Sequence, residues 1–260
     1  MLEKIQVMQE KSAEKSLSKE LILPHCPTKL RGTPNSFLRS ALFSAIQSKD
    51  RQFVKDELVA SQDGINILYT GEQLNQEDLT LWEALVHLAK ETPLGTSCEF
   101  TAYEILKELK LYTGGEQHKQ LEAGITRLSS GTVKIKHNGK KYFGSLIQSG
   151  VITEQTDHYI ITLDRQLFGL YLQSTWVNWE QRLQIRRKPL AQALHGYYSS
   201  HKIPYPVKLE TLQKYTGSRN KQKASFKRQT ISALNELIVL GFLQSYTING
   251  DLVSVKKKSD

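Results

Sequence analysis

Basic residues that could bind a polyanion are concentrated in one stretch of the sequence. Between residues 202 and 228 there are eight Lys or Arg side chains and a single acidic residue, Glu210. Lysine and arginine bind phosphate groups, and arginine can also donate two hydrogen bonds to guanine in the major groove of duplex DNA. This stretch therefore predicts nucleic-acid binding through both phosphates and bases.

A helix expected over residues 223–240 would present part of this set on one face. At about 100° per residue, apolar side chains from Phe226 to Ile238 share one side, and a polar stripe lies opposite them. The stripe has no acid in its first half, unlike a helix that merely faces solvent. Three lysines follow a hairpin expected over 243–255, where they would meet phosphate. The predicted DNA-binding residues of this half are Thr216, Arg219, Lys221, Lys223, Ser225, Lys227, Arg228, Gln229, Ser232, Lys256, Lys257 and Lys258.

The excess positive charge belongs to the last third of the chain. The whole chain has 35 Lys and Arg against 26 Asp and Glu, a net charge of +9. Residues 1–174 contain 20 basic and 21 acidic residues, net −1, whereas residues 175–260 contain 15 and 5, net +10. A basic part beside a neutral part suggests a polyanionic partner, and nucleic acid is the commonest.

Sequence patterns typical of catalysis, metal binding or nucleotide binding are absent. There is no Gly-x-x-x-x-Gly-Lys-Ser/Thr loop, no His-x-His pair and no His-Glu-x-x-His. Cys26 and Cys98 are too few for a cysteine-based zinc site, and we expect both to be reduced. The adjacent acids Glu77 and Asp78 are expected on solvent-facing positions. The sequence therefore favours a binding protein over an enzyme, with no catalytic residue, metal or cofactor predicted.

The second half of the chain follows the element order of a winged helix. A helix is expected from Pro189, a short helix over 209–215 stopped by Gly217, and a longer helix ended by Gly241. A β-hairpin around Asn249-Gly250 follows. Helix, turn, helix and hairpin in this order are typical of winged-helix domains.

The first half repeats this order more weakly. The expected elements are a helix from Thr33-Pro34 to Ile46 with Thr33 as its N-cap, a strand over 65–70, a helix over 74–89, a strand over 98–100, a helix over 102–111, a helix through Leu121, Ile125 and Leu128, a hairpin over 133–143 around Asn138-Gly139, a strand over 159–163 and a short helix over 166–172. The candidate DNA-binding residues are Lys119, Gln120, Arg127, Lys134 and Lys136. Because Glu116 and Glu122 dilute the helix charge, we expect this half to contact the DNA backbone or another protein.

A short internal repeat links the two halves. Tyr112-Thr113-Gly114 recurs as Tyr215-Thr216-Gly217, and each copy is expected to end the short helix before the longer one. We therefore predict an α+β chain with two tandem winged-helix domains. The predicted division is a flexible N-terminal arm over 1–33, a first winged-helix domain over 34–174 and a second, basic one over 175–260.

No apolar run is long enough to span a bilayer, and the N-terminus lacks a charged-then-apolar signal sequence. We therefore expect a cytoplasmic protein that has no membrane contact.

Four segments together resemble the TrfA-type plasmid replication initiators. They are residues 34–43, 189–201, 204–212 and 250–253, which bracket most of the chain. The resemblance implies two winged-helix domains that bind direct repeats (iterons) of double-stranded DNA in the origin of a bacterial plasmid. It further implies opening of an adjacent AT-rich region into single strands and recruitment of the host initiator, helicase and sliding clamp, without a nucleotide cofactor. A monomer–dimer equilibrium is also implied. The N-terminal arm matches no family motif.

Two other functions are compatible with the pattern. One is a winged-helix transcriptional repressor that binds an operator, and the other is a protein–protein adaptor that never reads DNA. Unequal tandem domains and the family resemblance favour initiation over repression, and the basic stripe disfavours the adaptor. Tandem repeats beside an AT-rich tract would support initiation, whereas one palindrome at a promoter would support repression.

Overall fold

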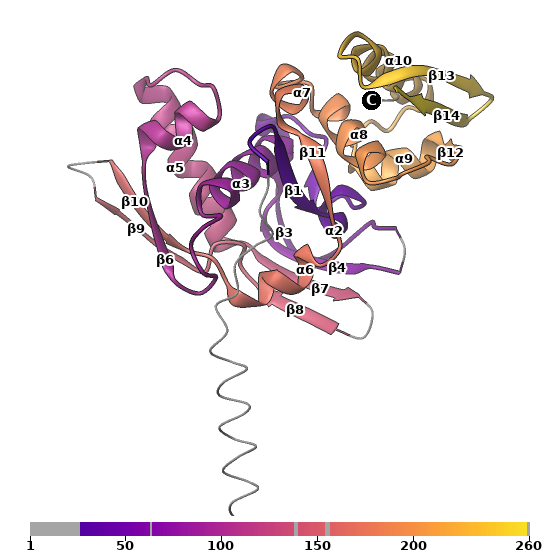
Figure 1. Cartoon of the computed structure of the whole chain (residues 1–260). Coiled ribbons are helices and arrows are strands. Elements are labelled where there is room, and N and C mark those ends of the chain that lie inside the picture. The colour runs from indigo at the N-terminus through magenta and orange to yellow at the C-terminus, as the bar shows by residue number, and fades with distance from the viewer. Residues whose placement is uncertain (1–26, 63, 138–139, 154–156, 259–260) are drawn as a thin grey trace, which may run out of the picture.

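The molecule has a larger and a smaller part, with hydrophobic cores formed by residues from Phe37 to Trp179 and from Ile185 to Val253. Helix α3 (Gln76–Leu88) is enclosed within the larger part (Figure 1). The computed structural model describes residues 27–62, 64–137, 140–153 and 157–258. Asn75 begins α3 with a capping box, because its side chain accepts from the N–H of Asp78 while the Asp78 carboxylate accepts from the Asn75 N–H at 2.9 Å. Every residue from Asp78 to His87 is buried, so α3 packs on all sides.

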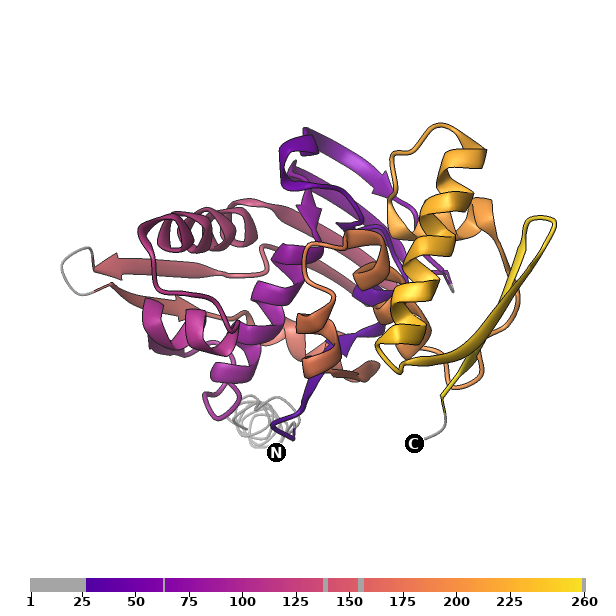
Figure 2. The same cartoon turned by 90° about the horizontal axis from the view of Figure 1, so that it is seen from above.

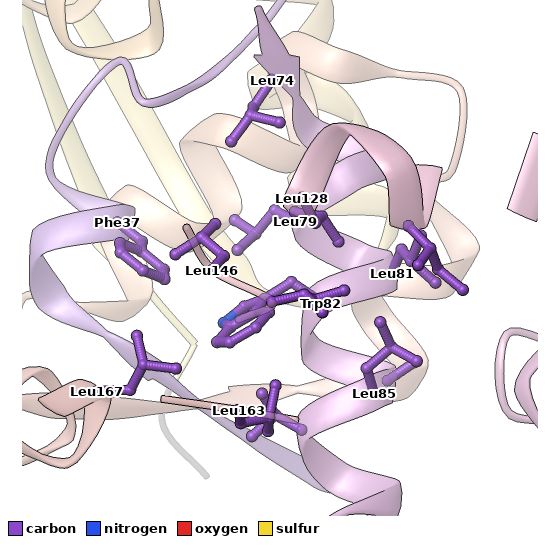
Figure 3. Packing of buried hydrophobic residues seen from close by; sticks show 14 of the residues in the cluster. Phe37, Leu74, Leu79, Leu81, Trp82, Leu85, Leu128, Leu146, Leu163 and Leu167 are labelled. Atoms are coloured by element: carbon purple, nitrogen blue, oxygen red, sulfur yellow. The ribbon is translucent and has the colours of Figure 1, made fainter. Parts of the chain in front are cut away.

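The core around α3 joins residues that are far apart in the sequence. Trp82 is completely buried, and Figure 3 shows it among Phe37, Leu163 and Leu167. The rings of Phe37 and Trp82 meet edge to face with centroids 6.5 Å apart. The same hydrophobic cluster includes Val177, so residues near the start and near the end of the larger part belong to one core with α3.

A four-stranded antiparallel sheet covers one side of this core. Its order is β3 (Phe53–Val59), β4 (Asn66–Glu72), β7 (Thr132–His137) and β8 (Lys140–Gly144). The alternating burial of β4, with Ile67 and Tyr69 inside, is typical of a strand with one face on the core.

A second sheet lies at the far end of the larger part, together with two helices (Figures 1 and 2). After β6 (Ser97–Thr101) come α4 (Ala102–Glu108) and α5 (Gly115–Ser130), and later β9 (Ser149–Thr153) and β10 (His158–Thr162). β6 pairs with β10, and β10 pairs with β9. The element order is therefore strand, helix, helix and hairpin, with the first strand completing the sheet.

The hairpin expected over 133–143 exists as β7 and β8, although its turn, Asn138-Gly139, lies outside the described residues. It does not pair with the strand that precedes α4. β7 instead pairs with β4, and the hairpin that completes the β6 sheet is β9–β10. The hairpin itself is therefore confirmed, but its pairing with β4 was not predicted, because that pairing joins segments far apart in the sequence. We call β7–β8 the inserted hairpin, since it lies between α5 and β9.

The N-terminal residues of the described chain pair with the middle of the sequence. β1 (Leu30–Pro34) is antiparallel to β11 (Ser174–Asn178), and α7 (Trp179–Gln184) follows. The predicted arm lies largely outside the described residues, but its last residues belong to β1. A short turn of 3-10 helix (Arg165–Leu167) and α6 (Phe168–Tyr171) form the helix expected over 166–172.

The smaller part follows α7 and has its own core. Its helices are α8 (Pro189–Ser199), α9 (Leu209–Thr216) and α10 (Lys223–Val239), and its sheet has the order β12 (Val207–Lys208), β14 (Leu252–Lys257) and β13 (Leu243–Asn249). The hydrophobic core of this part begins at Ile185, whereas Leu183 packs against the core around α3. The domain division at 174/175 remains a prediction. Along the sequence, the change from one hydrophobic core to the other occurs about ten residues later, between Leu183 and Ile185.

The helix predicted over 34–46 was wrong. α2 contains only Asn35–Leu38, and β2 (Phe43–Ser44) then pairs in parallel with β5 (Leu74–Asn75). The backbone N–H groups of Ala41 and Ala45 are satisfied by carbonyls of Ala60 and Thr216, which replaces helical hydrogen bonding. Thr33 does not cap a helix, because its hydroxyl donates to the buried Glu83 carboxylate at 2.6 Å.

The Tyr-Thr-Gly repeat adopts two different structures. Gly217 ends α9 in the left-handed conformation, with φ of 62°, whereas Gly114 is the extended N-cap of α5 and lies six residues after Glu108, where α4 ends. Only the second copy stops a helix as expected.

Candidate nucleic-acid interface

Helix α10 presents a buried side and an exposed polar side. Phe226, Leu234 and Leu237 are 1% exposed or less, and they form its inner side. The α10 outer face, as we name it, consists of the exposed residues Arg228, Gln229, Ser232 and Asn235. An exposed arginine beside amide and hydroxyl groups can read base edges in a major groove.

The turn that leads into α10 is held by side-chain amides. The Gln213 side-chain amide donates to the Asn220 carbonyl, and the Asn220 amide donates to the Ser225 hydroxyl at 2.8 Å. Ser225 is half-buried and already bonded, whereas Lys221, in the turn, and Lys223, the first residue of α10, are exposed. These bonds position the exposed lysines beside the outer face.

Two predicted DNA-binding residues are engaged with the larger part. Thr216 is only 3% exposed, its hydroxyl donates to the Gln213 carbonyl, and its own carbonyl accepts from the Ala45 N–H at 2.6 Å. Arg219 is exposed, but it donates to the Asp50 carbonyl at 2.6 Å and to the Gln73 side chain. Thr216 and Arg219 therefore hold the two parts together in this structure.

The β13–β14 hairpin is attached to one flank of α10. Lys227 donates to the Gly250 carbonyl at 2.9 Å, and the Tyr246 hydroxyl donates to Asn235 at 2.9 Å. At the end of β14 and directly after it, Lys256 and Lys258 are exposed, whereas Lys257 is half-buried and donates to the His201 carbonyl at 2.7 Å. Lys256 and Lys258 are therefore the lysines of this set that are available to phosphate.

The charge around α9 is partly neutralised. Lys214 and Glu210 form an i,i+4 ion pair of 2.8 Å on the exposed side of α9. The hydrogen bond between them raises the pKa of Lys214 and lowers the pKa of Glu210. The positive charge available to a polyanion is therefore centred on α10.

In the larger part, α5 has an exposed polar face. Lys119 and Gln120 are exposed, and Gln120 donates to Glu116 at 2.9 Å. Thr126 and Ser130 extend this face along the helix. Lys134 forms an exposed 2.9 Å ion pair with Asp56, and Lys136 is exposed; both lie on the inserted hairpin.

Arg127 has a structural partner. Its Nε and terminal nitrogen both donate to Asp78, at 3.1 and 2.9 Å, and Arg51 approaches the other oxygen of the same carboxylate at 3.0 Å. Asp78 is 1% exposed, so the expectation that it faces solvent was wrong. A buried carboxylate needs these cations, which explains why Arg127 points at α3.

Metal-binding groups, membrane-spanning helices and reactive cysteines in the described part of the chain would each indicate another kind of function. No group of three or more His, Cys, Asp or Glu among the described residues could hold a metal ion, and no described helix is long and apolar enough to cross a membrane. Cys98 is buried, which raises the pKa of its thiol to about 11. Cys26 lies outside the described residues.

The solved structures that are similar to this chain include two of RctB and one of the Pi initiator protein. Domains 2 and 3 of RctB, as a selenomethionine derivative, superpose with a TM-score of 0.60 at 13% identity, covering 88% of this chain and 99% of that one. A second structure of RctB domains 2–3 gives 0.57 at 14% identity, covering 85% and 95%. The Pi initiator protein in complex with iteron DNA gives 0.52 at 10% identity, covering 71% and 95%. These likenesses show a shared fold.

The sequence comparisons are more specific. The plasmid replication initiator protein TrfA of Escherichia coli is 28% identical over 242 residues, which cover 89% of this chain and 63% of that relative. The family model for the TrfA protein matches residues 4–257. Because that match spans nearly the whole sequence, the chain belongs to the TrfA family.

Proposed function

We propose that this chain is a plasmid replication initiator that binds direct repeats of duplex DNA in an origin. The observation that carries the proposal is the α10 outer face, where Arg228, Gln229 and Ser232 are exposed together beside a lysine-bearing hairpin. The E. coli relative carries the name of plasmid replication initiator, and the Pi structure contains iteron DNA. Both support DNA as the ligand of this chain.

We propose that both parts contain a winged-helix unit. In the smaller part, α8, β12, α9, α10 and the β13–β14 hairpin would form it, with α10 as the recognition helix. In the larger part, the corresponding elements are α3, β6, α4, α5 and the β9–β10 hairpin. The pairing of β6 with β10 and of β12 with β14 supports this correspondence.

The two units are expected to contribute unequally. The outer face of α10 has no acid near Arg228, whereas α5 carries Glu116 and Glu122 beside Lys119 and Gln120. We therefore assign most base reading to α10 and mainly backbone contacts to α5. Lys256 and Lys258 would contact phosphate, as would Lys136 if the inserted hairpin reaches the duplex.

Further partners follow from the family. We propose that origin opening exposes single-stranded AT-rich DNA and that the host initiator, helicase and sliding clamp bind this chain in the bacterial cytoplasm. A monomer–dimer equilibrium belongs to the same proposal. We also propose that the chain acts by binding, without a metal, a nucleotide cofactor or an enzymatic activity.

The test is selection of a binding sequence by the purified chain from a randomised duplex pool, followed by titration. We expect one enriched sequence, two protected regions about one helical turn apart in a hydroxyl-radical footprint, and tandem copies of that sequence near the gene. Affinity should fall with salt at a log–log slope of about −5 to −8, from about six to nine neutralised phosphates. A flat salt response, or no enriched sequence, would contradict the proposal.

A further inference from the structure

A groove of about 900 Å³ lies between the two parts of the molecule, against α10. One wall is formed by residues 45–52, and a second by residues 187–191 at the start of α8. The third wall is the α9–α10 turn with Gln229 and Ser232 of the α10 outer face. The groove therefore opens beside the surface that we assign to base reading.

Cationic side chains outnumber acidic ones in this groove. The cations are Lys49, Arg51, Arg187, Lys188 and Arg219, and the acids are Asp50 and Glu236. They come from three separate segments of the chain, so their proximity depends on how the two parts are packed together. Of these five, sequence reasoning singled out only Arg219, because the other four lie in segments that are far from it in the sequence.

Three of the five cations already have partners. Arg51 pairs with Asp78 at 3.0 Å, Lys188 pairs with Glu236 at 2.6 Å, and Arg219 donates to the Asp50 carbonyl. Within the part of the chain that the structure describes, Lys49 and Arg187 form no ion pair, and both are exposed. Arg219 donates only to uncharged groups, so the unneutralised positive charge of the groove lies on Arg219, Lys49 and Arg187. Of these three, Arg219 is already bonded across the two parts, which leaves Lys49 and Arg187 for a ligand.

The groove and the β13–β14 hairpin lie on opposite flanks of α10. Lys227 and Asn235 bond to the hairpin, whereas Gln229 and Glu236 line the groove. A helix inserted in a major groove has a sugar-phosphate backbone on each side. If the β13–β14 hairpin contacts one of these DNA backbones, the other must pass through the protein groove between the two parts.

We infer that the groove between the two parts holds a DNA backbone, and that Lys49 and Arg187 contact its phosphates. Arg187 has a φ of 64°, a left-handed conformation that costs free energy for a residue other than glycine and recurs at functional sites. The inference rests on the proposed DNA-binding function and extends the interface beyond α10 to the larger part and the segment joining the two.

The test uses the full chain with the double substitution Lys49→Gln and Arg187→Gln. The matched control is Lys29→Gln with Lys107→Gln, two exposed lysines that do not line the groove. The probes are the duplex enriched from the randomised pool and a scrambled duplex of the same length. Binding is measured over a range of salt concentrations, and thermal unfolding confirms that each variant is folded.

We expect the groove variant to weaken binding to both duplexes by a similar factor. Its log–log salt slope should be less negative than that of the wild type by about 1 to 2, because each lost phosphate contact removes about 0.9. Ethylation interference should identify phosphates required by the wild type and by the control but no longer by the groove variant.

The outcomes separate this inference from the function on which it rests. Unchanged affinity and slope for a folded groove variant, with specific binding by the wild type, would overturn the groove and leave the proposed function standing. An equal loss in the control would also overturn it, since any surface charge would then suffice. Failure of the wild type to bind either duplex would overturn both.

Discussion

Arg182 and Glu83 form an ion pair of 2.6 Å with side chains that are 0% and 1% exposed. The guanidinium also donates to the Gln76 carbonyl and the Thr80 hydroxyl, and the Glu83 carboxylate accepts from Thr33. The pair therefore joins α7 to α3 and to β1. Transfer of a charged side chain from water into the protein interior costs free energy, and the opposite charge of the partner offsets this cost. Loss of either partner would therefore leave an uncompensated charge in the core.

Glu83→Gln should strongly destabilise the fold. It leaves the Arg182 charge buried without its counter-ion, and we expect the free energy of unfolding to fall by about 3–5 kcal/mol. Urea denaturation followed by circular dichroism measures this. The matched control is Glu180→Gln, which removes the exposed 2.6 Å pair with Lys110 and should cost less than about 1 kcal/mol. Similar losses in the two variants would contradict a special role for the buried pair.

Arg228→Ala should weaken binding to the enriched duplex more than to a scrambled one. A bidentate contact from arginine to guanine is worth about 1–3 kcal/mol, or about 5- to 150-fold in affinity. Lys256→Ala is the matched variant, and it should weaken both duplexes alike because lysine beside the hairpin meets only phosphate. Both side chains are exposed, so folding should be unaffected. Equal losses on both duplexes for Arg228→Ala would instead make Arg228 a phosphate contact.

Gly217→Ala should disturb the packing of the smaller part on the larger one. Gly217 has a φ of 62°, and an added Cβ would lie 2.6 Å from the Ser44 hydroxyl oxygen and 3.1 Å from the Ala41 Cβ. Gly250 has a φ of 59°, but no described atom beyond its chain neighbours would meet its Cβ within 4 Å. Gly250→Ala should therefore show only the left-handed backbone cost, about 1–2 kcal/mol.

The loss of stability in Gly217→Ala should exceed that in Gly250→Ala, and the difference measures the clash with Ser44. Thermal unfolding of both variants under the same conditions provides the comparison. If the two glycines give the same loss, the contact between Gly217 and the larger part contributes nothing to stability.

Local signals in the sequence were sufficient to predict most elements of the smaller part. Pro189, Gly217 and Gly241 mark the boundaries of the helices there, and the spacing from Phe226 to Leu237 indicates the buried side of α10. Hairpin β13–β14 was also predicted, with its two-residue turn one position later than Asn249-Gly250. Each of these features depends on neighbours within a few residues.

The errors occurred where long-range contacts override local patterns. The apolar spacing from Phe37 to Ile46 is helical, yet β2 pairs with β5 and the backbone bonds to distant carbonyls. Arg127 and Asp78 are charged residues, a type usually found at the surface. The fold instead packs α5 against α3, so that the two side chains form an ion pair there. The groove around Lys49 and Arg187 likewise requires segments separated by more than a hundred positions, which no local pattern can join.

His195 should make the stability of the fold depend on pH. It is fully buried, its ring meets Phe242 with centroids 4.5 Å apart, and its Nε2 donates to the Gln181 side chain at 3.2 Å. Burial, and then the nearby charge of Arg182, lower the pKa of His195 to about 3. An unfolded histidine has a pKa near 6.5, so between pH 6.5 and about 3 the unfolded state binds a proton that the folded state does not.

That proton uptake favours unfolding as the pH falls. His195 should lower the free energy of unfolding by about 1.4 kcal/mol for each pH unit below 6.5, down to its folded pKa, and should have no such effect above pH 6.5. Urea titrations at pH 7.5 and pH 5 should therefore show a decrease about 2 kcal/mol larger in the wild type than in His195→Gln, which has no titrating group at this position. The variant's own packing cost is read at pH 7.5, and carboxylates affect both chains equally. Parallel pH profiles for the two chains would show that His195 is protonated in the folded state or that its burial does not persist in solution.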